Sequence, residues 1–98
     1  MSKSIMPKDI PECCWICGRA GDTDVHHIFG GANRKWSEKY GLTVHLCRGC
    51  HRKVHDYVDG LMSGLHKAGE QVYIDQYFEG DTEAGIEGFR KVFGKNYL

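Results

Sequence analysis

Two cysteine pairs with the same short spacing constrain this 98-residue chain more than any other feature of its sequence. Cys14 and Cys17 form the first pair, and Cys47 and Cys50 form the second, with two residues inside each pair. A two-residue gap lets a tight turn aim two thiolates at one point, and tetrahedral zinc takes four such ligands. The spacing therefore predicts one structural Zn²⁺ ion bound by all four cysteines.

The fifth cysteine, Cys13, is an alternative partner for Cys17, but that gap is one residue longer, so Cys14 is the preferred ligand. Redox-active or free buried cysteines are the other interpretation, although a redox site needs only one such pair. An odd number of cysteines and no export signal in the first residues favour a reducing compartment. Because no apolar stretch approaches the roughly 18 residues of a membrane span, we expect a soluble cytoplasmic protein with no membrane partner.

The hydrophobic pattern predicts an α+β fold. Alternating residues rich in β-formers predict short strands at residues 23–28 and 42–47, with a turn of helix at 35–40 between them. A helix of about four turns should follow the second cysteine pair, because apolar residues recur there at helical spacing at Val54, Val58, Leu61 and Leu65.

Two shorter helices are expected in the rest of the chain. One is predicted at residues 72–78, and the other follows an Asp81 cap and carries Ile86, Phe89 and Phe93. Gly60 and Gly64 weaken the preceding four-turn helix and can end it early.

The length of the chain allows a single domain. Residues 1–12 contain both prolines and no periodicity, so we expect a flexible N-terminal arm. Residues 13–98 should form the domain, with a zinc-bound core at 13–67 and a helical extension at 68–98. The strand, loop, strand and helix make a unit of about 40 residues, which is near the lower limit that hydrophobic burial alone can stabilise, so zinc should hold it together.

Charge is unevenly distributed, although 13 basic residues balance 13 acidic ones. The net charge is −1 for residues 1–30, +5 for residues 31–55 and −4 for residues 56–98. A charge run is usually a solvated face, but this basic stretch lies beside the cysteine pairs. We expect it to contact the phosphates of nucleic acid through Arg34, Lys35, Arg48, Arg52 and Lys53.

Four of the six histidines fall into two patterned pairs. His51 and His55 lie one helical turn apart, so both imidazoles face the same side and can share an ion. His26 and His27 are consecutive on a predicted strand, where neighbouring side chains point to opposite faces. One of them can therefore complete a three-histidine site while the other reaches a nearby water. Three protein ligands leave positions open, which is typical of a catalytic metal. His45 and His66 are expected to be ordinary hydrogen-bonded residues.

Residues 14–55 resemble the HNH nucleases, whose ββα-metal unit often carries a treble-clef-like tetracysteine zinc site. The resemblance covers 42 of the 98 residues. The shortness of the chain is similar to that of small phage or prophage HNH proteins. It is carried by Cys14-Trp15-Ile16-Cys17, Val25-His26-His27-Ile28, Leu46-Cys47-Arg48-Gly49-Cys50-His51 and His55.

The resemblance implies a zinc-stabilised ββα-metal unit followed by two or three packed helices. It implies that His27 is the general base, and that His26, His51 and His55 bind a catalytic divalent ion (Mg²⁺, Mn²⁺, Ni²⁺ or Zn²⁺). The reaction it implies is hydrolysis of DNA phosphodiester bonds. The central asparagine of the family is missing, because its place falls near Gly41 or Leu42 and Asn33 comes too early.

Two classes of function follow. The first is a metal-dependent DNA endonuclease, and the second is a non-catalytic zinc-binding module that attaches to DNA or to a protein. The acidic C-terminal half also offers a surface for a phage or repair protein partner. A metal count separates the two classes, since the nuclease needs a second ion beside the structural zinc.

Overall fold

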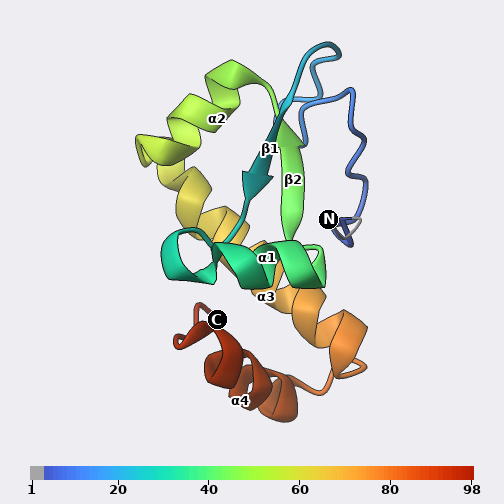
Figure 1. Cartoon of the computed structure of the whole chain (residues 1–98), viewed down its shortest axis with the longest axis vertical. Coiled ribbons are helices and arrows are strands. Elements are labelled where there is room, and N and C mark those ends of the chain that lie inside the picture. The colour runs from blue at the N-terminus through green and yellow to red at the C-terminus, as the bar shows by residue number, and fades with distance from the viewer. Residues whose placement is uncertain (1–3) are drawn as a thin grey trace.

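The two strands form an antiparallel pair in the computed structural model, which describes residues 4–98 (Figure 1). Strand β1 spans Asp24–His27 and β2 spans Thr43–Leu46, with Asp24 opposite Leu46 and His27 opposite Thr43. Both strands lie within the predicted ranges. The fold is therefore a small α+β unit in which the hairpin carries the histidine pair.

The connection between the strands is helical, as predicted, and longer than one turn. A short 3-10 helix, η1 (Gly31–Asn33), leads into α1 (Arg34–Tyr40). Gly41 ends α1 with a positive φ of 73°, a conformation that glycine adopts without steric cost. This turn sends the chain back into β2.

The predicted four-turn helix is interrupted, and this corrects the sequence expectation. Helix α2 covers Arg48–His55, η2 covers Val58–Gly60, and α3 runs over 17 residues, Leu61–Tyr77. Tyr57 and Asp59 have φ values of 58° and 51°, which a continuous helix does not allow. The apolar stripe is thus divided between two helices, and the helix expected at residues 72–78 is the end of α3.

The last helix, α4 (Thr82–Phe93), confirms the prediction of a helix after Asp81. The Asp81 carboxylate accepts a hydrogen bond from the backbone N–H of Ala84 at 3.2 Å and caps the helix. Helix α4 packs closely against α3, because a Cβ on Gly85 would lie 2.6 Å from two side-chain carbons of Ile74. Among residues 4–98, none of the helices has both the length and the apolar character that crossing a membrane requires.

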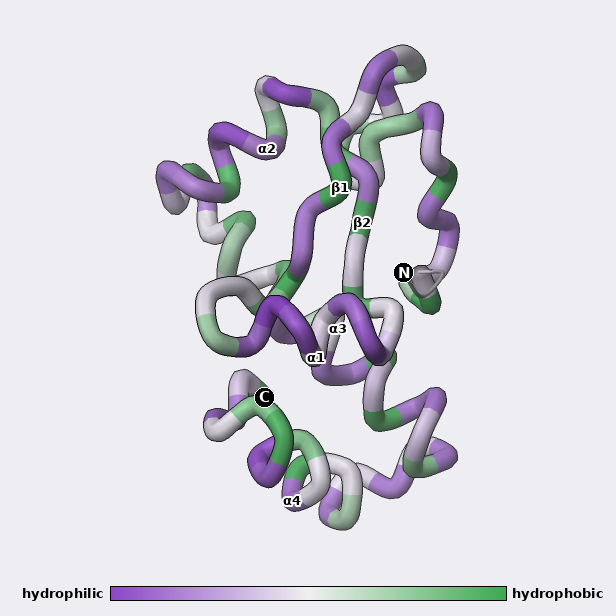
Figure 2. Tube along the Cα trace, viewed as in Figure 1, coloured by the Kyte–Doolittle hydropathy of each residue, from purple (hydrophilic) through white to green (hydrophobic). Residues whose placement is uncertain are grey.

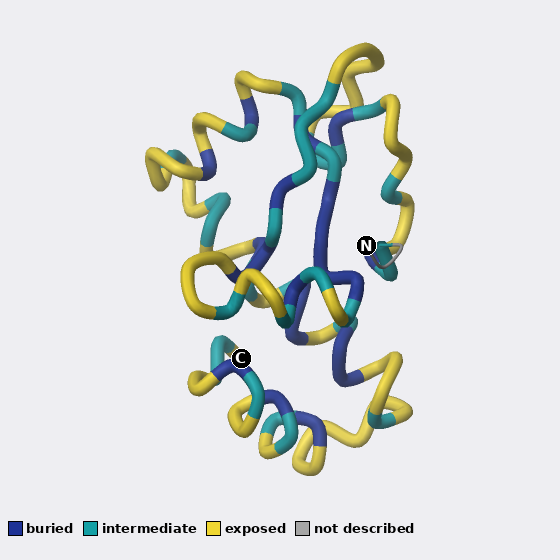
Figure 3. Tube along the Cα trace, viewed as in Figure 1, coloured by how far each residue is buried: buried dark blue, intermediate teal, exposed yellow. Residues whose placement is uncertain are grey.

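One continuous core joins the hairpin to the C-terminal helices. Many of the hydrophobic stretches of the chain are also buried, and β2 is buried along most of its length (Figures 2 and 3). The ring of Phe29, just after β1, lies 5.1 Å from the ring of Phe89 and 4.8 Å from that of Phe93, measured between centroids. The C-terminal helices therefore support the segment that follows the histidine pair.

Residues 4–12, within the segment expected to be a flexible arm, include side chains and backbone groups that contact the rest of the domain. Met6 is only 4% exposed, and the N–H of Ile5 donates to the carbonyl of Gly41 at 2.9 Å. The Asp9 carboxylate accepts from the backbone N–H of His45 and pairs with its ring Nδ1, both at 2.8 Å. Residues 1–3 of the predicted arm lie outside the described residues.

Candidate metal centres and active site

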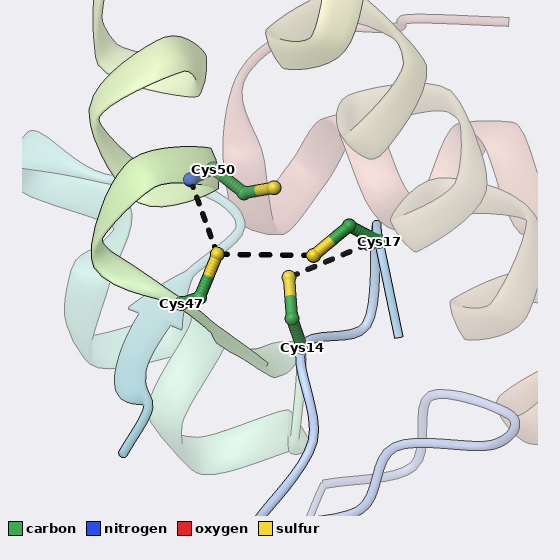
Figure 4. A group of neighbouring side chains, drawn as sticks. All are labelled: Cys14, Cys17, Cys47 and Cys50. Carbon is green, nitrogen blue, oxygen red and sulfur yellow. Dashed lines mark hydrogen bonds between the residues drawn. The ribbon is translucent and has the colours of Figure 1, made fainter. Parts of the chain in front are cut away.

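The four predicted zinc ligands come together from two separate turns (Figure 4). Cys14 and Cys17 lie in the turn before β1, whereas Cys47 precedes α2 and Cys50 lies in its first turn. All four sulfur atoms lie within 4.8 Å of one another. The Cys17 and Cys47 sulfurs are 3.9 Å apart, close to the separation of about 3.8 Å that two sulfurs 2.3 Å from one tetrahedral zinc would have.

The thiols differ in how readily they ionise. Burial alone would raise the pKa of Cys14, but backbone N–H groups of Cys17, Cys47 and Ile16 aimed at its sulfur lower it to about 6. Burial, together with hydrogen bonds among the neighbouring thiols, raises the pKa of Cys50 to about 12. Four thiolates packed this closely repel one another unless a cation lies between them, and zinc supplies that charge.

Cys13 stays outside this cluster. It forms an isolated β-bridge with Ala20, while the neighbouring Cys14 joins the group. The structure thus agrees with the preference for the tighter Cys14–Cys17 pair. The arrangement is a tetracysteine cluster suited to a structural zinc ion.

A second group of possible metal ligands consists of His26, His51 and His55. The ring centroid of His26, on β1, lies 5.1 Å from that of His51 and 5.3 Å from that of His55, both on α2. The Nε2 atoms of His51 and His55 are 3.1 Å apart. His26 Nε2 is buried without a hydrogen-bond partner among the described residues. An orphaned buried nitrogen beside two convergent imidazoles fits a divalent metal ion.

The surroundings of His26 favour its neutral imidazole form. Burial, reinforced by the charges that neighbouring His51, His55 and His27 carry when protonated, lowers the pKa of His26 to about 4. At neutral pH His26 is therefore unprotonated, which is the form that ligates metals.

A pocket of about 340 Å³ is lined by the three-histidine group and also by His27. His27 itself is not a member of that group. Its side chain is 12% exposed, and its Nε2 lies 3.9 Å from a carboxylate oxygen of Glu38, beyond hydrogen-bond distance. Burial and the positive charge of Arg34 lower the pKa of His27, and Glu38 opposes them. His27 Nε2 is buried and has no hydrogen-bond partner among the described residues. A neutral imidazole can accept a proton from a water molecule that reaches it.

One residue of the predicted basic set lines this pocket, and two others lie near its histidines on α2. Arg34 lines it at the start of α1. Arg48 and Arg52 lie on the side of α2 that adjoins His51 and His55, since helix positions turn by about 100° per residue.

The two lysines of the predicted set occupy other faces. Lys53 lies on the side of α2 opposite His51 and His55, again by helical spacing. The amino group of Lys35 lies over the ring of Trp36, 5.0 Å from its centroid. Neither lysine lines the histidine pocket.

Two carboxylates beside the histidines were missed from the sequence. Asp24 lies 3.4 Å from Nδ1 of His51, and Glu38 approaches His27. Asp24 precedes His26 by two residues and so shares its strand face, a signal that the sequence contains. Glu38 is brought near His27 by the path of α1, which no local pattern indicates.

The two histidines expected to have ordinary roles lie outside both clusters. His45 pairs with Asp9, and the ring of His66 stacks on Phe29 at 5.3 Å.

Comparison of the chain with protein-family models, with curated proteins and with solved structures finds no match.

Proposed function

We propose that this protein is a metal-dependent endonuclease of the HNH type that hydrolyses phosphodiester bonds in DNA. The observation that supports it most is the pocket in which His27, with an unpartnered nitrogen, borders the convergent group of His26, His51 and His55. A proton acceptor beside a metal site with open positions is the arrangement that metal-assisted hydrolysis requires.

In this proposal the three-histidine group holds the divalent ion. A divalent ion bound there would supply positive charge to polarise the phosphate and stabilise the departing 3′ oxygen. His27, uncharged at neutral pH because burial and Arg34 lower its pKa, takes a proton from the attacking water. Such a base contributes about 10²- to 10⁴-fold to the rate.

Basic side chains around the pocket would hold the DNA backbone. Arg34 borders the pocket, and Arg48 and Arg52 flank the histidine face of α2. Phosphate contacts fix position without reading sequence, so we propose weak sequence specificity. Three contacts correspond to a slope of about −3 when the logarithm of affinity is plotted against the logarithm of salt concentration.

The test is a plasmid-nicking assay with full-length, zinc-loaded protein in the presence of Mg²⁺, Mn²⁺, Ni²⁺ or Zn²⁺. Wild-type protein should convert supercoiled plasmid to nicked circles with at least one of these ions. His27→Ala should lower the rate about 100-fold or more while the protein still binds two ions per chain. Absence of nicking with all four ions, or equal rates for His27→Ala and wild type, would contradict the proposal.

A matched pair of basic variants tests the DNA contacts. Arg34→Ala should weaken DNA binding and reduce the salt slope by about one. Lys53→Ala also removes one positive charge, but from the side of α2 that faces away from His51 and His55. It should change DNA affinity and the salt slope much less.

The second candidate is a non-catalytic zinc-binding module for DNA or for a protein partner. It is favoured by Gly41 and Leu42, which stand where the HNH family has its asparagine. Under this alternative the protein would bind one tightly held zinc ion and no second ion.

A further inference from the structure

Asp24 and His51 form a contact that the proposed catalysis does not use. Asp24 is the first residue of β1 and lies two positions before His26, so both side chains lie on the same face of the strand. A carboxylate oxygen of Asp24 is 3.4 Å from Nδ1 of His51. Within the described part of the chain, His51 is the member of the three-histidine group that has a carboxylate partner.

The two ring nitrogens of His51 have different neighbours. Nδ1 faces Asp24, while Nε2 lies 3.1 Å from Nε2 of His55. A neutral imidazole has one N–H group and one lone pair, and an ionised carboxylate can only accept a hydrogen bond. The proton of neutral His51 therefore belongs on Nδ1, which leaves the lone pair on Nε2, where the histidines converge.

We propose that Asp24 is a positioning residue that fixes the tautomer and the ring orientation of His51 for metal binding. The inference builds on the three-histidine metal site of the proposed function. Asp24 itself lies outside the group whose ligand atoms converge. A hydrogen-bonded carboxylate behind a ligating histidine raises the basicity of the ligand, and its loss typically costs 10- to 100-fold in metal affinity.

The experiment measures metal affinity and does not require nuclease activity. Full-length protein with zinc in the tetracysteine cluster is titrated with Ni²⁺ by calorimetry, and its zinc content is measured before and after. Asp24→Ala should bind Ni²⁺ about tenfold or more weakly than wild type. Asp24→Asn keeps an oxygen that can accept from Nδ1–H, so it should retain part of the affinity.

Asp56→Asn is the matched control. Asp56 caps the end of α2 next to His55 and pairs with Arg52 at 3.8 Å, so this variant removes one negative charge near the site without touching His51. Its Ni²⁺ affinity should stay close to that of wild type.

Nitrogen NMR of ¹⁵N-histidine-labelled protein before Ni²⁺ addition gives a second measurement. Wild-type His51 should be the Nδ1–H tautomer, and Asp24→Ala should shift it toward Nε2–H. Unchanged affinity and tautomer in Asp24→Ala would overturn the inference, as would an equal loss of affinity in Asp56→Asn.

The inference and the nuclease proposal can fail separately. If the Asp24 variants behave as expected but the protein does not nick DNA, the positioning role stands and the proposed activity fails. If wild-type protein nicks DNA and Asp24→Ala binds Ni²⁺ normally, only the positioning role fails. If wild-type protein binds no second ion, the positioning role is overturned together with the metal site.

Discussion

Ser37 and Phe29 exchange two hydrogen bonds inside the protein. The Ser37 hydroxyl donates to the carbonyl of Phe29 at 2.8 Å and accepts from its backbone N–H at 2.9 Å. Ser37 is fully buried. Its hydrogen bonds to Phe29 join the two ends of the segment that holds Arg34 beside the histidine pocket. A single hydroxyl thereby satisfies both backbone groups of Phe29, the second residue after β1.

Removing this hydroxyl should destabilise the protein. Ser37→Ala leaves the N–H and the carbonyl of Phe29 buried without a partner, so we expect a loss of about 1–3 kcal/mol in the free energy of unfolding. Urea unfolding of the zinc-loaded protein measures it. The control is Ser63→Ala, at an exposed position on α3, which should change stability by less than about 0.5 kcal/mol. Equal losses in both variants would show that the exchanged bonds contribute nothing specific.

Glu70 should make stability depend on pH in the direction opposite to that of most carboxylates. It is fully buried, one of its oxygens accepts from the backbone N–H of Tyr97 at 2.7 Å, and the other has no partner among residues 4–98. Burial raises the pKa of Glu70 above its ordinary value, against the opposing effect of the Tyr97 N–H.

The sign of the pH effect follows from proton binding. Between the unfolded and the folded pKa of Glu70, the folded state binds more protons, so the contribution of this group to stability falls as pH rises. Glu70→Gln removes that dependence and keeps an acceptor for Tyr97. The free energy of unfolding, measured in urea between about pH 5 and 8, should fall less with rising pH, or rise more, in Glu70→Gln than in wild type. Glu79→Gln, at an exposed position, should leave the slope unchanged, and parallel curves for all three proteins would refute the prediction.

Loss of one cysteine ligand should release zinc and unfold the region around it. Cys17→Ser removes one of the four thiols, and the binding free energy of a structural zinc is on the order of 10 kcal/mol. Elemental analysis should give less than one tightly held zinc per chain, with loss of secondary structure by circular dichroism. Cys13→Ser is the neighbouring control and should retain its zinc. Zinc loss in Cys13→Ser but not in Cys17→Ser would reassign the ligand set.

Two helical glycines should respond to alanine with opposite signs. Gly64→Ala in α3 meets open space and should stabilise the protein by about 0.5–1 kcal/mol through helix propensity. Gly85→Ala in α4 places a methyl group 2.6 Å from Ile74 carbons and should destabilise it despite the same gain. Thermal unfolding of both variants decides the point, and stabilisation by Gly85→Ala would mean that α3 and α4 are not packed this closely.

Spacing made the two ligand groups predictable from the sequence. The two-residue gaps bring the cysteines of each pair together locally, and the one-turn separation aligns His51 with His55. Strand alternation predicted that His26 and His27 would separate, and the structure groups His26 with the α2 histidines. The assignment of metals, the base and DNA to these residues stays a prediction.

Long-range contacts and unusual backbone angles explain what the sequence did not reveal. The apolar stripe runs past Tyr57 and Asp59 without interruption, and neither residue type signals a positive φ as glycine does. The packing of residues 4–12 depends on the Asp9–His45 pair, which joins residues 36 positions apart. Local patterns contain no information about such a contact.

Helix α2 carries members of both clusters, and two of them, Cys50 and His51, are consecutive residues. The angle between the directions of the Cys50 and His51 side chains is therefore set by the rotation per residue of one helix. A single residue inserted between them would rotate one cluster by about 100° relative to the other. The relative orientation of the two clusters therefore depends on the length of this segment as well as on its side chains.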